Sequence, residues 1–206
     1  MKDFILVTVI GFCAGWLALL PAKSIGFAIT ASTVVILVVG LSFFAPLALF
    51  VVKLLGRKWK VLEEFGKFAA VGTLNTLLDI GVLNALMITT GIVAGIGFSG
   101  FKAISFLVGT TNSYFWNKFW TFQNSMPISV SQYSRFFLFT LVGTGINVSV
   151  ASVLVNGIGA PAGISPSLWA NISALIAVFT AMMWNFLSYR KIVFKKDIPV
   201  TPTTNN

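Results

Sequence analysis

Long apolar runs, separated by short polar or glycine-rich breaks, make up most of this chain. A helix needs about 20 mostly apolar residues to cross the hydrocarbon core of a bilayer. One run, 136–189, has no charged residue and is too long for a single crossing, but the stretch 156–166 contains glycines and prolines that divide it. We therefore predict six membrane-spanning helices, at about residues 4–20, 24–52, 68–90, 101–120, 136–155 and 167–189.

The composition agrees with this pattern. The chain has 206 residues, of which 57% are hydrophobic and 9% are charged. Soluble domains carry about 25% charged residues, so this chain has too few polar residues to cover a soluble core of its size. We expect an all-α polytopic membrane protein.

The basic residues predict how the spans are oriented. Loops on the cytoplasmic side of a membrane protein are enriched in Lys and Arg. Lys23 and Lys102 fall on one side of the predicted spans, and the other cations fall on the opposite side: Lys2, Lys53, Arg57, Lys58, Lys60, Lys67, Lys118, Arg135, Arg190, Lys191, Lys195 and Lys196. We expect both termini in the cytoplasm and the chain in the plasma (inner) membrane. The net charge of +9 is explained by this placement, and nothing resembles a nucleic-acid-binding module.

The first apolar segment leaves two interpretations open. It could be part of a retained hairpin, or a secretory signal peptide, because Lys2 precedes it. No small-x-small cleavage pattern follows it, since Leu20 and Ala22 flank Pro21. We favour retention.

The inventory of reactive side chains is small. The chain has no histidine, one cysteine and five acids. It therefore lacks the commonest general base and the commonest metal ligand. We expect no metal, no cofactor and no enzymatic activity of its own.

Asp79 is the most informative residue, because it interrupts an otherwise apolar span. An ionisable group in hydrocarbon costs a few kcal/mol or more, which favours a function or a partner. Asn75 precedes it by one helical turn and shares its face. Asp79 is about 16 Å into its span, and Asn112, Asn147 and Thr180 fall at a similar depth in the other helices. An acid lining a wet groove would bind sugar hydroxyls or couple a proton, whereas a dry, unpaired acid would be protonated.

Neither nearby cation is expected level with Asp79. Lys102 is predicted near the outer end of the fourth span and Lys118 near its inner end. The segment that ends this span contains Tyr114 and Asn117, and it is explained equally well as an interfacial anchor or as a site for a lipid phosphate or sugar headgroup. Arg190 closes the same predicted membrane face.

Spans three and four resemble spans five and six. Residues 68–73 match 139–144, residues 105–117 match 173–185, and each half closes on a basic residue followed by an aromatic one, in 118–122 and 190–194. A unit of two spans predicts two parallel repeats. The region matching Asp79 has no second acid, so the halves are not chemically equivalent. Internal repeats are frequent in transporters, although a duplicated scaffold would show them too.

These motifs resemble a known family. The series Phe65-Gly-Lys-Phe68-x-x-Val-Gly72-x-x-Asn75-Thr-x-x-Asp79, then Ser105-Phe and Asn117-Lys-x-Trp-Thr-Phe122, is similar to the GtrA-like family of small four-span proteins. The closing segment 185–194 also looks like that of the family. We therefore divide the chain into an N-terminal transmembrane hairpin with a basic linker (1–60), a GtrA-like domain (61–196) and a disordered tail (197–206).

The resemblance implies a role in cell-surface polysaccharide or glycolipid synthesis. Members are thought to flip polyprenyl-phosphate-linked monosaccharides, or to anchor a partner glycosyltransferase. As a flippase, the chain would line its path with Asp79, Asn75 and Asn112 and bind headgroups through Tyr114 and Asn117. It would hold phosphate through three cations, Lys118, Arg190 and Lys102.

Two other functions stay open at this stage. A non-transporting anchor for a glycosyltransferase would depend on Arg57, Lys60 and Arg135 rather than on Asp79. A small-molecule exporter would share only the embedded acid. The hairpin 4–52 is extra to the four-span pattern; it would suit docking of a partner, and it leaves open whether the chain forms a homo-oligomer.

Overall fold

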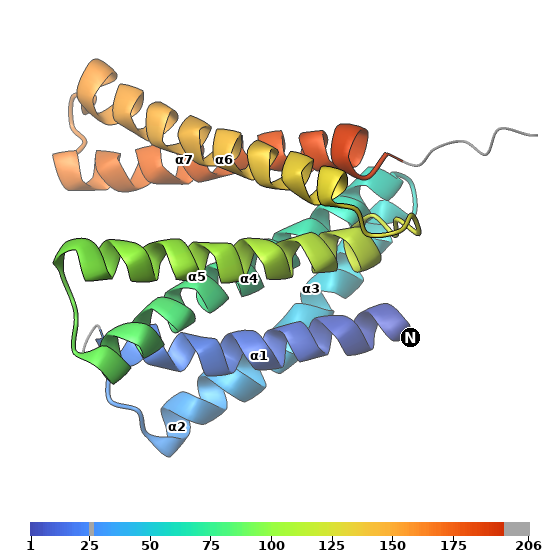
Figure 1. The fold of residues 1–206 in the computed structure, drawn as a ribbon, viewed down its shortest axis with the longest axis horizontal. Helices are drawn as coiled ribbons and strands as arrows, with labels where there is room; N and C mark the ends of the chain where they lie inside the picture. The colour runs from blue at the N-terminus through green and yellow to red at the C-terminus, as the bar shows by residue number, and fades with distance from the viewer. Residues whose placement is uncertain (25–26, 196–206) are drawn as a thin grey trace, which may run out of the picture. The chain divides into compact units, whose positions relative to one another are not determined.

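The computed structural model describes residues 1–24 and 27–195, and the described residues form helices and connecting loops without any strand (Figure 1). This confirms the predicted all-α polytopic class. The chain divides into two compact units, Met1–Gln123 (unit 1) and Asn124–Asn206 (unit 2), which we describe separately. The predicted disordered tail, 197–206, lies outside the described residues.

Unit 1 contains the N-terminal hairpin and the first repeat. Its helices are α1 (Lys2–Ser24), α2 (Ala31–Val34), η1 (Val35–Val39), α3 (Gly40–Gly56), α4 (Lys60–Thr90), α5 (Gly95–Trp116) and η2 (Asn117–Thr121), where η marks a π-helical turn. The segments α2, η1 and α3 follow one another without a break, so they form one long helical stretch. Helix α1 packs against both α3 and α4, and α4 packs against α5.

Unit 2 contains the second repeat. Its helices are α6 (Val130–Ser152), η3 (Val153–Ile158), α7 (Pro166–Ser188) and η4 (Tyr189–Val193). Helix α7 begins with two typical N-terminal features. The Ser165 hydroxyl accepts a hydrogen bond from the Leu168 amide, and Pro166 occupies the first turn, where an amide N–H would have no partner within the helix. Helices α6 and α7 pack against each other as a hairpin.

Within the part of the chain that the structure describes, five helical stretches are long and apolar enough to cross a membrane: Lys2–Leu19, Ala31–Gly56, Lys60–Thr90, Val130–Ile158 and Leu168–Val193. They match five of the six predicted spans, and they identify a multi-pass membrane protein. The fourth predicted span is a helix too, α5, with a length of about 33 Å. It is less apolar because it carries Lys102 and a polar run at 110–113. The count of six spans therefore stays a prediction.

The break between α4 and α5 is shorter than predicted. Gly91 ends α4 in the left-handed conformation, with φ of 72°, and its amide donates to the Met87 carbonyl at 2.9 Å. Helix α5 then begins at Gly95, six positions before the expected Phe101. The glycines at the start of α5 do not prevent a helix, because an unpaired backbone N–H or C=O group in a membrane is costly and a helix satisfies these groups internally.

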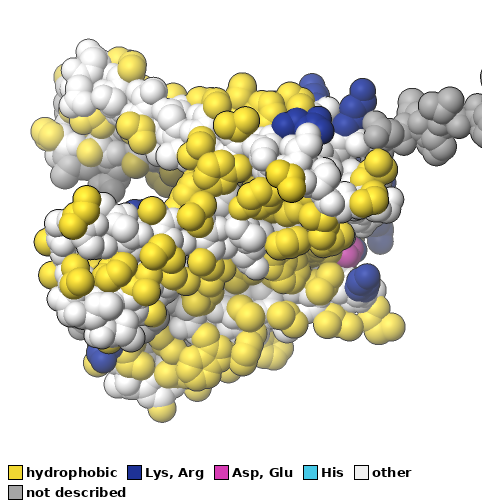
Figure 2. Space-filling view, viewed as in Figure 1, with side chains coloured by type: hydrophobic (Ala, Val, Ile, Leu, Met, Phe, Trp, Pro, Cys, Tyr) yellow, Lys and Arg dark blue, Asp and Glu magenta, His cyan; other side chains and the backbone are white. Residues whose placement is uncertain are grey.

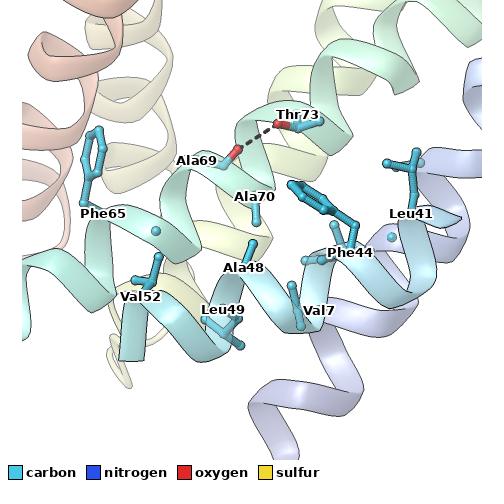
Figure 3. Close-up of a pocket in the computed structure, with 15 residues that line it drawn as sticks. Val7, Leu41, Phe44, Ala48, Leu49, Val52, Phe65, Ala69, Ala70 and Thr73 are labelled. Atoms are coloured by element: carbon cyan, nitrogen blue, oxygen red, sulfur yellow. Dashed lines mark hydrogen bonds between the residues drawn. The ribbon is translucent and has the colours of Figure 1, made fainter. Parts of the chain in front are cut away.

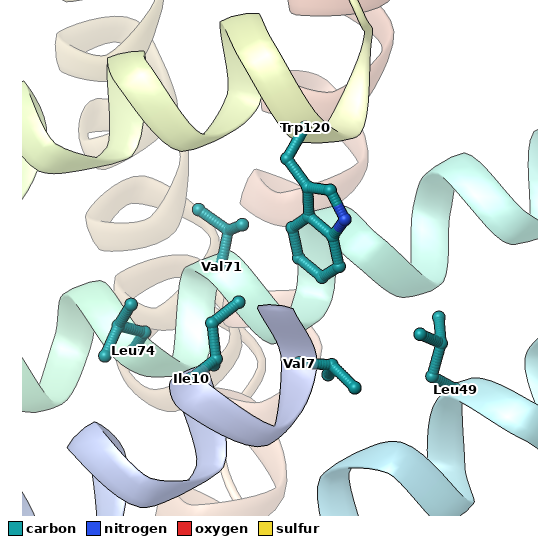
Figure 4. Packing of buried hydrophobic residues seen from close by; sticks show 6 residues of the cluster. All are labelled: Val7, Ile10, Leu49, Val71, Leu74 and Trp120. Carbon is teal, nitrogen blue, oxygen red and sulfur yellow. The ribbon is translucent and has the colours of Figure 1, made fainter. Parts of the chain in front are cut away.

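A compact apolar cluster joins the N-terminal hairpin to the first repeat. Val7 and Ile10 of α1, Leu49 of α3, Val71 and Leu74 of α4 and Trp120 of η2 are buried together (Figure 4). Helices α1 and α3 can come this close because two glycines of α1 face the α3 stretch: a Cβ at Gly15 would lie 2.5 Å from Val38 Cα, and one at Gly11 would overlap the Leu41 carbonyl.

The outer surface is apolar. Figure 2 shows hydrophobic side chains over much of the visible face, and Phe43, Ile96 and Leu175 are each more than 70% exposed. Such exposure is unusual for a protein in water but is expected for helices that face lipid.

Both repeats end in the same local structure. The π-helical turns η2 and η4 each finish on a phenylalanine whose amide reaches back five residues, from Phe122 to the Asn117 carbonyl and from Phe194 to the Tyr189 carbonyl. This agrees with the predicted match between 118–122 and 190–194. Each repeat is thus a helical hairpin closed by a π-turn, while the parallel arrangement of the two repeats stays a prediction.

Candidate functional site

A polar ladder runs between α4 and α5. On α4, Asn75 and Asp79 lie one turn apart and both face α5, as their spacing predicts. Asn112 of α5 donates to Asn75 Oδ1 at 2.7 Å, and Asn75 itself donates to the Val71 carbonyl at 2.7 Å. Because α4 and α5 run antiparallel, the next rung, at Asp79, meets residues that come earlier in α5.

The rung at Asp79 combines an ion pair with a hydrogen bond. Lys102 Nζ binds Asp79 Oδ2, and the Ser105 hydroxyl donates to Asp79 Oδ1 at 2.5 Å. The Ser105 hydroxyl also lies 3.1 Å from the Lys102 carbonyl. Both carboxylate oxygens therefore have a partner, which is what an acid in a membrane helix requires.

The rung is only partly shielded. Ser105 is fully buried, whereas the side chains of Asp79 and Lys102 are 22% and 47% exposed. Asn112 also borders an open hollow on α5, which Thr111 and Phe115 help to line. A polar ligand could thus reach the ladder without separation of the helices.

Gly109 lets the two helices approach at this level. A Cβ at this position would lie 3.3 Å from the Asn75 carbonyl oxygen and 3.5 Å from Asp79 Cβ. A larger side chain would push α5 away from both rungs. Gly109 therefore sets the distance across which Lys102 and Ser105 reach Asp79.

The sequence did not predict the ion pair between Lys102 and Asp79, because Lys102 was expected much nearer the outer end of its span. Asp79 stands eleven positions before the end of α4 at Thr90, and Lys102 stands seven positions after the start of α5 at Gly95. The difference is about 6 Å along the helix axes, which a lysine side chain spans. The early start of α5 also explains why Asn112, predicted level with Asp79, lies opposite Asn75.

Three other predicted site residues lie where α5 ends and η2 begins. Tyr114, Asn117 and Lys118 are fully buried. Asn117 donates to the Ser113 carbonyl at 2.9 Å, while its Oδ1 has no hydrogen-bond partner among the described residues. Asn117 lies twelve positions after Ser105, about 18 Å along the helix, so this group is separate from the Asp79 rung.

The remaining predictions fall in unit 2. Arg190 is on η4 and Asn147 on α6, and the Thr180 hydroxyl donates to the Ile176 carbonyl of its own helix at 2.8 Å. The proposed grouping of Arg190 with Lys118, and the four-helix polar layer, concern both units and stay predictions. Among the described residues, no cluster of three His, Cys, Asp or Glu could hold a metal ion.

Sequence reasoning missed a charge cluster at the N-terminal end of α1. Asp3 binds Lys53 of α3 at 2.6 Å and Lys67 of α4 at 2.9 Å, and it accepts the Trp120 indole N–H at 3.0 Å. Lys67 also pairs with Glu63 at 2.9 Å, and its side chain is only 3% exposed. This charge cluster connects α1, α3, α4 and η2. The i,i+4 spacing of Glu63 and Lys67 was the available signal, whereas nothing local linked either residue to Asp3.

Comparison with known proteins identifies the first repeat and the second as parts of one domain. A family model described as "GtrA/DPMS, transmembrane domain" matches residues 67–194. The uncharacterised membrane protein YngA of Bacillus subtilis (strain 168) is 29% identical over 133 residues, which cover 65% of this chain and 80% of the relative. No solved structure matches the chain significantly.

Proposed function

The chain belongs to the GtrA/DPMS transmembrane-domain family, and from this membership and its polar ladder we propose that it moves a polyprenyl-phosphate-linked monosaccharide across the plasma membrane. The family links the chain to the processing of lipid-linked sugars. The observation that carries the finer proposal is the rung at Asp79, where Lys102 and Ser105 of the neighbouring helix bind an acid inside a span.

The chemistry of such a substrate fits this rung. A sugar headgroup loses its hydrogen bonds to water when it enters hydrocarbon, which costs several kcal/mol for each unpaired group. Asp79, Ser105 and the Asn75–Asn112 pair replace those bonds along the path. The prenyl tail stays in lipid throughout, so the protein has only the headgroup to accommodate.

Lys102 supplies the contact for the phosphate. Its side chain is 47% exposed and pairs with the Asp79 carboxylate. The substrate phosphate competes with Asp79 for this ammonium, while the released carboxylate accepts sugar hydroxyls. During the exchange the ammonium always has an anionic partner and the carboxylate always has hydrogen-bond donors, which lowers the cost of separating the pair. The chain performs no covalent step, and sugar transfer belongs to a separate membrane-associated glycosyltransferase.

The test is a headgroup-accessibility assay in vesicles that contain only this protein and a polyprenyl-phosphate sugar. We expect Asp79→Ala and Lys102→Gln to abolish transport while both variants still insert. Thr76→Ala is the matched control, because Thr76 is exposed on α4 and its hydroxyl donates to the Gly72 carbonyl of its own helix. Wild-type transport by Asp79→Ala would refute the proposal.

One observation favours a second function, a membrane anchor that recruits a glycosyltransferase. The connection from α3 to α4 exposes Arg57, Lys58 and Lys60, which could meet an acidic surface of a partner. We expect an anchor to lose its partner when Arg57 and Lys60 become glutamine. Pull-down of a glycosyltransferase by the Asp79→Ala variant, with no transport by the wild type, would favour the anchor.

A further inference from the structure

An apolar slot lies between the N-terminal hairpin and α4, on the side of α4 away from α5. It has a volume of about 430 Å³. Helix α1 contributes Val7 to its lining, and small side chains of the other two helices also line it, including Ala48 of α3 and Ala69 and Ala70 of α4 (Figure 3). The slot has no part in the polar ladder, so a ligand bound in it would be independent of the proposed transport function.

The shape of the slot is a wedge. Helices α3 and α4 meet where a Cβ at Gly66 would lie 2.5 Å from Val52 Cγ1, and this contact closes one end. At the other end Phe44 and Thr73 are exposed, so the slot opens to the surrounding lipid. The only side-chain oxygen in the lining, that of Thr73, is bonded to the Ala69 carbonyl at 3.1 Å. Water would find no free partner there, whereas a hydrocarbon chain would fit.

The closed end of the slot lies near a group of exposed cations. Arg57 follows Val52 by five positions, about 8 Å along the helix, and Lys58 and Lys60 are next to it. This region has three acids, Asp3, Glu63 and Glu64, and the first two are bound by Lys53 and Lys67. Five cations, those two lysines with Arg57, Lys58 and Lys60, outnumber the acids, so the level where a lipid headgroup would sit keeps a net positive charge. Such basic sites select anionic headgroups.

We propose that this slot binds one acyl chain of an anionic phospholipid, with the phosphate of the headgroup over the α3–α4 connection. A prenyl carrier is a poorer occupant, because Asn75 and Asp79 face α5 while the slot faces α1 and α3. If the carrier phosphate binds Lys102, α4 separates this headgroup from the slot, so the prenyl chain of the same molecule would have to pass around α4 to enter it. The bound lipid fills the gap that the hairpin leaves against α4.

Native mass spectrometry of the delipidated full chain tests this proposal. The probes are phosphatidylglycerol, phosphatidylcholine with the same acyl chains, and a polyprenyl phosphate. We expect phosphatidylglycerol to bind best. Ala69→Leu and Ala48→Leu, which fill the slot from different helices, should each weaken it about tenfold, as expected if two buried methylenes are displaced. Ala85→Leu, at an exposed position of α4, should have no effect.

A charge variant provides a measurement that leaves the packing alone. Replacing Arg57, Lys58 and Lys60 by glutamine should lower phosphatidylglycerol binding to the level of phosphatidylcholine. Equal binding of the two phospholipids to the wild type, or unchanged binding to both leucine variants, would overturn the proposal. Preferential binding of polyprenyl phosphate that is lost in Ala69→Leu would also overturn it and assign the slot to the carrier. Because Asp79 is intact in all these variants, the outcome is independent of the transport result.

Discussion

The Ser105 hydroxyl donates a 2.5 Å hydrogen bond to Asp79, and the part of the second repeat that the structure describes has no counterpart of this bond. Ser173, which matches Ser105 in sequence, is equally buried, but its hydroxyl has no hydrogen-bond partner among the described residues. The reason is the missing acid: the stretch of α6 that matches Asp79 is apolar apart from serines and Asn147. The two matched serines are therefore buried to the same extent, but they differ in hydrogen bonding.

The two serines allow a matched comparison. Ser105→Ala removes a hydrogen bond to a charged group, worth about 1.5–3 kcal/mol, so we expect it to lower the stability of unit 1 and to slow transport. Ser173→Ala removes a hydroxyl that has no partner among the described residues, so we expect little loss of stability and near-normal transport. Thermal unfolding in detergent and the vesicle assay measure the two effects. Equal losses in both variants would mean that the bond to Asp79 has no special role.

The Asp79–Lys102 pair can be tested by a double-mutant cycle. Asp79→Asn alone leaves an ammonium without its partner, and Lys102→Gln alone leaves a carboxylate, so both single variants should be less stable than the wild type. The double variant should lose less unfolding free energy than the two single variants added together, and we expect this coupling energy to be about 1–3 kcal/mol. Additive losses would show that the ion pair does not form in the membrane.

The same double variant separates stability from function. If Lys102 and Asp79 handle the substrate, transport should not return when stability does. Recovery of both together would indicate that the pair only holds α4 against α5. Thermal unfolding and headgroup accessibility, measured on the same vesicle preparation, distinguish these results.

Gly109 should tolerate very little added volume. A leucine there would collide with the Asn75 carbonyl and with Asp79, and overpacking of this kind typically costs about 1–3 kcal/mol. Gly100→Leu is the control, because a Cβ at Gly100 meets nothing within 4 Å. We expect Gly109→Leu to lower the unfolding temperature and transport, and Gly100→Leu to leave both close to normal. A stable, active Gly109→Leu variant would contradict the close approach of α4 and α5.

The charge cluster around Asp3 should stabilise the attachment of the hairpin. Asp3→Asn removes the charge that Lys53 and Lys67 share, and Lys67 is almost fully buried. Glu63 still compensates Lys67, so we expect a loss of about 1–3 kcal/mol rather than unfolding. Lys60→Gln, at an exposed position, should change stability by less than about 0.5 kcal/mol. Limited proteolysis within residues 27–30, together with thermal unfolding, would detect loosening of the hairpin.

The sequence predicted most of the helices but not all of their ends. Apolar length and the breaks at Gly91 and 156–166 were sufficient to place the helices, because a membrane span is defined mainly by local composition. The start of α5 was predicted six residues late, since the glycines at 95, 97 and 100 suggested a loop that membrane surroundings do not favour. Because of that error, Lys102 was predicted too close to the outer end of its span.

The sequence by itself determined the class of the protein and the duplicated helical hairpin, and it placed Asp79 and Asn75 on one face of their helix. These come from hydropathy, repetition and the cost of an acid in hydrocarbon, all of which can be read along the chain without knowing how the helices pack. Only the tertiary structure decided that Lys102 and Ser105 bind Asp79, that Asn112 faces Asn75, and that Asp3 joins three helices. Those contacts depend on the register between helices and on the reach of flexible side chains, which residues distant in the sequence set jointly when they pack.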